Sequence, residues 1–228
     1  MCIAERGVDE LQDKKIHTVM KILEEEVSRL GFPIVTEMSR NRRDPYRILI
    51  STLLSLRTKD ETTRKAAKRL LVKAPTAEKL LRLREETIRE LIYPVGFYKR
   101  KAVVLKDVCR AIVHRHGGKV PDDLDTLLKL QGVGRKTANL VITLGYGKPG
   151  ICVDTHVHRI SNRLGYVRTK NPEETEFALR KKLPSRYWIP INDYLVAYGQ
   201  NVCKPVSPFC SRCRLASYCD RVGVGKHR

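Results

Sequence analysis

Four cysteines crowd the C-terminal end of the chain and form its densest group of chemically reactive side chains. They are Cys203, Cys210, Cys213 and Cys219, in the spacing Cys-x6-Cys-x2-Cys-x5-Cys, so four thiols fall within 17 residues. Four buried apolar cysteines would not gather this tightly by chance, and the spacing therefore predicts a metal centre. Tetrahedral zinc and a cubane iron–sulfur cluster both accept four thiolates, so the chemistry alone does not separate them.

A tight turn between two predicted helices has the sequence Gln-Gly-Val-Gly at residues 131–134. Since Gly132 and Gly134 carry no side chains, the backbone amides and the first N–H groups of the following helix can approach an anion closely. Arg135 and Lys136 come next and favour binding of a DNA phosphate there. The alternative is an ordinary turn between helices.

Lys136 has two candidate roles, as a point charge on a phosphate or as a nucleophile. A lysine near other cations and partly shielded from water keeps a fraction of neutral amine, which can attack an electrophilic carbon. Arg135 supplies such a neighbouring charge. Asp154 lies 18 residues further on, at the start of another predicted helix, where it is either simply an N-cap or a rigidly placed reactive carboxylate.

The charge balance points to a polyanionic partner. Lysine and arginine number 45 against 25 aspartates and glutamates, which gives a formal net charge of +20. Nucleic acid, an anionic membrane surface and a merely soluble basic surface are all consistent with this excess. The basic residues are spread through structured-looking segments, which favours nucleic acid. No apolar stretch reaches the ~18–20 residues that cross a bilayer, and the N-terminus lacks the apolar core of a signal peptide, so we expect an intracellular protein.

The elements that must position these residues are helices. Apolar residues recur at intervals of three and four along most of the chain, the pattern of an all-α fold. Helix starts are expected at Asp44, Thr58, Thr76 and Asn171, and a loop at 145–150 is a candidate domain boundary. The expected helices span 9–30, 45–56, 59–73, 76–83, 85–93, 97–116, 123–130, 134–145, 154–164, 172–183 and 190–202.

The motifs together resemble one known family. Residues 130–138, Leu-Gln-Gly-Val-Gly-Arg-Lys-Thr-Ala, resemble the helix-hairpin-helix of the endonuclease III family of DNA glycosylases. Val-Asp-Thr-His at 153–156 resembles the segment with the family's catalytic aspartate, and the cysteine spacing matches that around the family's iron–sulfur (4Fe-4S) cluster. The family's usual proline is Gln131 here, a change that should cost rigidity of the turn and little chemistry. The resemblance extends from about Asp44 to Cys219.

The resemblance implies covalent chemistry at Lys136. In the family this lysine attacks the sugar C1′, expels the damaged base and leaves a Schiff base. The iminium acidifies the C2′ proton, and its loss breaks the 3′ phosphate ester by β-elimination. Asp154 would stabilise the cationic sugar and help deprotonate Lys136.

Two further positions follow from the resemblance, because a glycosylase must fill the gap that a flipped base leaves in the duplex. Phe97 would be the wedge, unless it is a core aromatic. Arg57 stands where the family commonly has glutamine. The two N–H edges of its guanidinium group can pair with guanine O6 and N7, so we expect a preference for damage opposite guanine. The alternative is that Arg57 only contacts a phosphate. The residues expected to contact DNA are Arg57, Phe97, Gly132, Gly134, Arg135, Thr155 and His156.

The architecture that the resemblance implies has two helical lobes. A six-helix domain of residues 38–149 contains the helix-hairpin-helix, and residues 1–37 and 150–228 form an iron–sulfur cluster domain. Double-stranded DNA with a damaged base or abasic site would bind across the cleft between them. The chain would act as a monomer, associated with DNA in the cytoplasm or nucleoid if it is prokaryotic, with no membrane partner.

The implied activity is that of a bifunctional DNA glycosylase and AP lyase of base excision repair, which removes damaged, oxidised pyrimidines. One alternative is a mismatch-directed glycosylase for thymine or uracil opposite guanine, or an adenine glycosylase, without lyase activity. Lys136 disfavours it, because such enzymes do not usually have lysine in the hairpin. The other alternative is a non-catalytic DNA-binding module in which the cysteines hold zinc.

Overall fold

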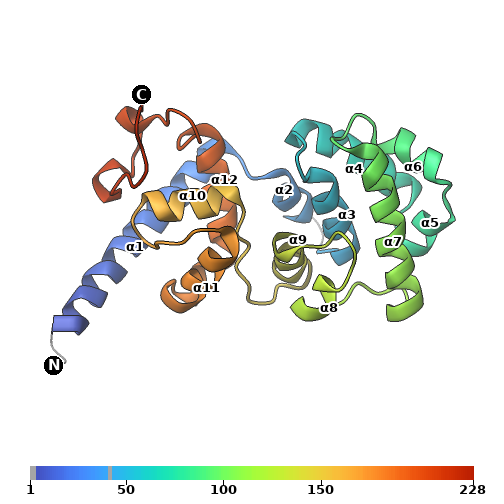
Figure 1. Ribbon diagram of the computed structural model, residues 1–228, viewed down its shortest axis with the longest axis horizontal. Coiled ribbons are helices and arrows are strands. Elements are labelled where there is room, and N and C mark those ends of the chain that lie inside the picture. The colour runs from blue at the N-terminus through green and yellow to red at the C-terminus, as the bar shows by residue number, and fades with distance from the viewer. Residues whose placement is uncertain (1–3, 41–42) are drawn as a thin grey trace. The chain divides into compact units, whose positions relative to one another are not determined.

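Helices joined by turns and loops make up the part of the chain that the structure describes. This computed structural model describes residues 4–40 and 43–228, with residues 4–14 described by their backbone alone. Within these ranges no strand forms, and the predicted all-α class is confirmed (Figure 1). No helix of the described ranges is both long and apolar enough to cross a membrane.

Contacts along the chain divide it into two compact units. Unit 1 combines Met1–Phe32 with Val153–Arg228, so both ends of the sequence belong to it. Unit 2 is the continuous segment Pro33–Cys152. From the sequence we expect boundaries at residues 38 and 149, and the assignment of a separate role to each unit stays a prediction.

Unit 2 is built around the helix α3. Its elements are α2 (Ile34–Arg40), α3 (Pro45–Ser55), α4 (Asp60–Lys73), α5 (Ala77–Arg82), α6 (Glu85–Ile92), α7 (Tyr98–His116), α8 (Leu124–Leu128), α9 (Arg135–Leu140) and the π-helical turn η1 (Val141–Gly145). Asp44 caps α3 as predicted, because its carboxylate accepts a hydrogen bond from Arg47 N at 3.1 Å. Leu49, Ile50 and Leu54 of α3 are fully buried, and the helix contacts α2, α4, α7, α9 and η1.

The long helix α7 is the second support of unit 2. It packs against α5 and α6 on one side and also contacts α3. Leu105, Val108 and Ile112 are fully buried at the spacing of one helical face. Gly117 ends the helix with φ +57°, a left-handed conformation that glycine adopts without strain.

Unit 1 brings the N-terminal helix beside the C-terminal part of the chain. Its elements are α1 (Ala4–Leu30), α10 (Thr155–Arg163), α11 (Pro172–Lys182), η2 (Ser185–Tyr187), α12 (Pro190–Asn201), η3 (Cys210–Arg212) and η4 (Ala216–Tyr218). α12 packs against both α1 and α10, and Figure 1 shows α1 in blue beside the orange α12. Asn171 caps α11 as predicted, accepting from Glu174 N at 2.9 Å.

Three features of unit 2 differ from the expectation. One continuous helix is expected over 134–145, but α9 ends at Leu140 and continues as the π-helical turn η1. The seven-residue helix α2 is not predicted, because so short a segment shows little periodicity; burial of Ile34 and Val35 in the core stabilises it. The predicted helix start at Thr58 is wrong, since α4 begins at Asp60 with Lys59 in the cap position. The Thr58 hydroxyl instead accepts a hydrogen bond from Gly96 N, at 3.1 Å.

Candidate functional site

The predicted helix-hairpin-helix forms from α8, a turn and α9. Gly132 has φ +81°, in the left-handed region, whereas Gly134 is extended and is the N-cap residue of α9. Leu130 and Val133 are buried in the core of unit 2, so the turn is fixed from beneath while Gly132 and Gly134 stay exposed. This exposes the turn's backbone toward solvent on a rigid base, as a phosphate-binding turn requires.

Lys136 lies in the first turn of α9. Its side chain is half-buried, as is that of Arg135, while Thr137 and Ala138 behind them are buried. The backbone of Lys136 is also fixed, because its carbonyl oxygen accepts a hydrogen bond from the Cys152 thiol at 3.6 Å. The predicted nucleophile thus has a well-fixed backbone and a half-buried side chain.

Asp154 is the N-cap of α10, which confirms that part of its prediction. Its Oδ1 accepts hydrogen bonds from His156 N at 2.8 Å and from Val157 N at 3.0 Å. Two backbone donors hold the half-buried carboxylate in place at the positive end of the helix dipole. Thr155 is exposed beside it. Asp154 therefore presents a fixed negative charge, which is what a charge-stabilising catalytic group needs.

The imidazole of His156 is held within unit 1. Its Nδ1 lies 3.1 Å from the Arg159 guanidinium. A Cβ placed on Gly199 of α12 would lie 2.3 Å from the same nitrogen, so this close approach of α10 and α12 needs glycine. The predicted contact of His156 with the DNA backbone stays a prediction.

Arg57 and Phe97, the predicted reader and wedge, lie together on two loops of unit 2. Both side chains are exposed, Phe97 to 62%, which rules out a core position for the phenylalanine. The Arg57 guanidinium carbon lies 5.7 Å from the centre of the Phe97 ring, a cation–π contact. Each residue has a left-handed backbone, with φ +52° for Arg57 and +57° for Phe97.

The four clustered cysteines lie in unit 1 after α12, and each is half-buried. Arg163 of α10 joins the ends of their segment: its guanidinium donates to Cys203 Sγ at 3.4 Å and to Lys204 O at 2.7 Å. The Arg163 carbonyl lies 3.2 Å from Cys219 Sγ. The sequence motifs do not predict a role for Arg163; the one signal is that Arg159 and Arg163 share one face of the helix that Asp154 caps.

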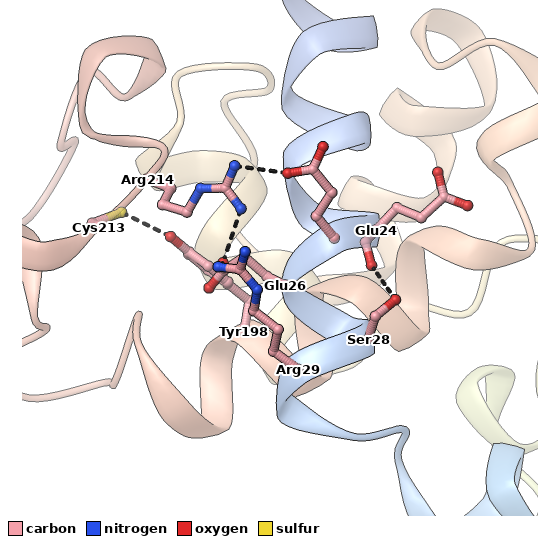
Figure 2. A network of polar contacts seen from close by, with 8 residues as sticks. Glu24, Glu26, Ser28, Arg29, Tyr198, Cys213 and Arg214 are labelled. Atoms are coloured by element: carbon pink, nitrogen blue, oxygen red, sulfur yellow. Dashed lines mark hydrogen bonds and ion pairs between the residues drawn. The ribbon is translucent and has the colours of Figure 1, made fainter.

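A second set of contacts ties the cysteine segment to α12 and α1. The buried Tyr198 hydroxyl lies 3.1 Å from Cys213 Sγ. Arg214 donates to Glu25 at 2.7 Å and to Glu26 at 3.1 Å, both on α1. Figure 2 shows Tyr198 directed at Cys213 and Arg214 reaching the carboxylates of the helix. The segment is thus attached to three helices of unit 1.

The four thiols are near enough to influence one another electrostatically. Burial raises the pKa of the Cys219 thiol, and the neighbouring Cys213, Cys203 and Cys210 raise it further. Burial likewise raises the pKa of Cys210, with contributions from Cys213 and Cys203. Among the described residues, no three cysteine, histidine, aspartate or glutamate side chains lie close enough to hold a single metal ion. Four thiols in one segment, with an Arg163 N–H directed at Cys203 Sγ, are the number and kind of donors that a cubane iron–sulfur cluster takes.

Comparisons with known proteins agree on one family. The profile of the HhH-GPD superfamily of base excision DNA repair proteins matches residues 50–185. Endonuclease III of Thermotoga maritima is 48% identical over 207 residues, which are 89% of this chain and 97% of that protein. A solved non-covalent endonuclease III–DNA complex is similar in fold, with a TM-score of 0.78 and 33% identity over 90% of this chain and 95% of that one. A thermostable thymine-DNA glycosylase is also similar, with a TM-score of 0.79 and 27% identity over 92% and 97%.

The two hairpin glycines provide a matched pair of substitutions. A Cβ on Gly132 would lie 2.6 Å from Val104 Cγ1 of α7 in a left-handed backbone, whereas a Cβ on Gly134 meets nothing within 4 Å. Gly132→Ala should therefore lower the free energy of unfolding by about 1–3 kcal/mol, and Gly134→Ala should change it by less than about 0.5 kcal/mol. Urea denaturation followed by circular dichroism measures both. Equal destabilisation by the two substitutions would contradict this geometry.

Proposed function

Because the chain belongs to the HhH-GPD superfamily of base excision DNA repair proteins and is a DNA glycosylase with AP lyase activity, we propose that Lys136 is its catalytic nucleophile. The observation that carries this assignment is the placement of Lys136. It is half-buried in the first turn of α9, directly after an exposed glycine turn that can hold a DNA phosphate. A phosphate bound there would fix the position of the adjacent sugar, and proximity of this kind supplies much of the rate.

In this proposal the Lys136 amine accounts for both base excision and strand cleavage. The neutral Lys136 amine attacks C1′, the glycosidic bond breaks, and the base leaves with its electron pair and takes up a proton. Loss of the amine proton and opening of the sugar ring give an iminium, which acidifies the C2′ proton. Removal of that proton expels the 3′ phosphate, and water then hydrolyses the Schiff base and releases Lys136.

Asp154 is assigned the electrostatic part of the reaction. Positive charge develops on the sugar as the base leaves, and a carboxylate already fixed by His156 N and Val157 N needs no reorganisation to stabilise it. Its position as an N-cap supports this role, because the cap hydrogen bonds hold the charge in one place.

The substrate that we propose is duplex DNA with an oxidised pyrimidine. Phe97, exposed at a loop tip, would enter the stack where the nucleotide leaves it, and Arg57 would contact the opposite base, with guanine preferred. The remaining DNA contacts are assigned to Gly132, Gly134, Arg135, Thr155 and His156. A monomer suffices for this activity, since every proposed group comes from one chain.

A second candidate substrate is thymine or uracil opposite guanine. The similarity to a solved thymine-DNA glycosylase favours it, at 27% identity over nearly the whole chain. The preference for guanine that we expect from Arg57 suits this substrate as well. Duplexes with an oxidised pyrimidine, thymine or uracil opposite guanine, compared in single-turnover assays, distinguish the two.

We also propose that Cys203, Cys210, Cys213 and Cys219 hold a 4Fe-4S cluster. Their spacing, their mutual electrostatic influence and the Arg163 N–H directed at Cys203 Sγ support this assignment. When bound, the cluster would cross-link this segment and offer one-electron chemistry. The proposed excision reaction uses no step at the cluster.

Lys136→Gln should abolish covalent trapping. In the presence of borohydride, the wild-type chain should form a stable adduct with DNA that contains an abasic site, because the reagent reduces the Schiff base. Lys129→Gln removes the same charge from an exposed position in the same hairpin and should leave trapping intact. Denaturing gel electrophoresis of the quenched mixtures measures the adduct. Undiminished trapping by Lys136→Gln would exclude Lys136 as the nucleophile.

Asp154→Asn should separate capping from catalysis. Asparagine caps helices as well as aspartate does, so the unfolding free energy should change by less than about 1 kcal/mol. Loss of the charge should slow base excision roughly a hundredfold. Chemical denaturation and single-turnover kinetics on the same preparation test both expectations. An excision rate near that of the wild type would show that Asp154 is only a cap.

The cluster assignment is tested on the purified protein. About four iron and four acid-labile sulfide per chain are expected, with broad visible absorbance. Elemental analysis that finds zinc and no sulfide would contradict the assignment.

A further inference from the structure

Lys101 connects two loops of unit 2 through its ammonium group. The side chain belongs to the first turns of α7 and is half-buried. Its Nζ donates to Leu54 O at 2.7 Å, to Leu56 O at 2.6 Å and to Thr58 Oγ1 at 3.2 Å. An ammonium group has three N–H donors, and here each has one acceptor. Through Lys101, α7 therefore fixes the loop that follows α3 and contains Arg57.

Thr58 extends this connection to the other loop. Its Oγ1 accepts from Gly96 N at 3.1 Å, besides the hydrogen bond from Lys101. A Cβ on Gly96 would lie 2.5 Å from Arg57 O, so the two loops touch backbone to backbone at a place that only glycine allows. Lys101, Thr58 and Gly96 therefore form one hydrogen-bonded junction directly beneath Arg57 and Phe97.

The junction explains why two residues beside it keep an unfavourable backbone conformation. Arg57 and Phe97 both have left-handed φ values, which L-residues other than asparagine and aspartate adopt rarely. Such conformations persist only where the surroundings determine them, and they gather at functional sites. Each lies next to a member of the junction, since Thr58 follows Arg57 and Gly96 precedes Phe97. The strained residues present their side chains outward as the cation–π pair.

We propose that Lys101 is a positioning residue that holds Arg57 and Phe97 in the arrangement in which they enter the duplex together. One half-buried lysine fixes both the reader and the wedge, so the enzyme extrudes a stacked, paired base efficiently only while the junction is intact. This inference rests on the roles proposed for Arg57 and Phe97. Keeping Lys101 charged at this position costs free energy, because burial lowers its pKa to about 8. The alternative is that Lys101 only caps the carbonyl groups at the end of α3, with no effect on how Arg57 and Phe97 are placed.

The test compares two lysines of α7. Lys106 is also half-buried and donates to a backbone carbonyl, Leu83 O at 2.8 Å, but it takes no part in the junction. Lys101→Met and Lys106→Met therefore remove the same charge and keep most of the stem. For each variant, two single-turnover rates are measured: base excision from a lesion duplex, and strand cleavage of the same duplex with a preformed abasic site. Fluorescence of 2-aminopurine beside the lesion reports unstacking directly.

A positioning role predicts a change in the ratio of these two rates. Lys101→Met should lower excision relative to abasic-site cleavage by at least about tenfold and slow the 2-aminopurine signal. Lys106→Met should leave the ratio within about twofold of the wild type. A ratio that Lys101→Met does not change, or that Lys106→Met lowers equally, would overturn the proposal.

Thr58 supplies an independent arm should Lys101→Met fail to fold. Thr58→Val removes the hydroxyl and should lower the ratio and slow the fluorescence change, whereas Thr58→Ser keeps the hydroxyl and should restore both. Equal behaviour of the two Thr58 variants would also count against the junction. If the wild-type chain gives no borohydride adduct, the role of Lys136 fails, and the fluorescence change still decides whether Lys101 positions the loops.

Discussion

The first turns of α7 are the support on which three loops of unit 2 depend. Phe97 stands at the start of the helix, Lys101 holds the loop of Arg57, and Val104 packs so closely on Gly132 that a Cβ there would lie 2.6 Å away. Since the buried leucine, valine and isoleucine side chains further along α7 fix it in the core, the three loops share one rigid base. If Phe97, Arg57 and the glycine turn act on one nucleotide as proposed, such a common support would make their placement accurate.

A single helix has a comparable task in unit 1. α10 begins at the Asp154 cap and ends at Arg163, whose guanidinium holds the cysteine segment at Cys203 and Lys204. Between them Arg159 donates to Cys203 O at 2.8 Å. The proposed catalytic carboxylate and the proposed cluster ligands are therefore attached to opposite ends of one short rigid element. A cluster bound to these cysteines would thus have a structural part in placing the carboxylate, without any part in bond breaking.

Local signals in the sequence predicted those features that depend on a few neighbouring residues. The caps at Asp44 and Asn171 and the glycine turn at 132 are of this kind, because the physical requirement and the residue that meets it are adjacent. Thr58 shows the limit: a threonine with a glutamate three residues later has the local pattern of a cap, yet its hydroxyl bonds Gly96, 38 residues away. Tertiary contacts of this type override a local preference.

The same limit applies to the candidate site. The motifs identified Lys136, Asp154 and the four cysteines, since each belongs to a compact pattern. Nothing in the sequence pairs Arg57 with Phe97, and Lys101 is one of several basic residues at the start of α7 until its three acceptors are seen. Arg163 is missed for the same reason, because its partners lie about 40 residues further along the chain.

In the proposed reaction, one amine forms a transient covalent bond with the sugar. Peptide mass spectrometry of the borohydride-reduced complex, after digestion of protein and DNA, locates that bond on the chain. The sugar remnant is expected on the peptide that contains Lys136, with fragment ions that assign it to this residue. A remnant on any other lysine or on the N-terminal amine would show that a different amine is the nucleophile.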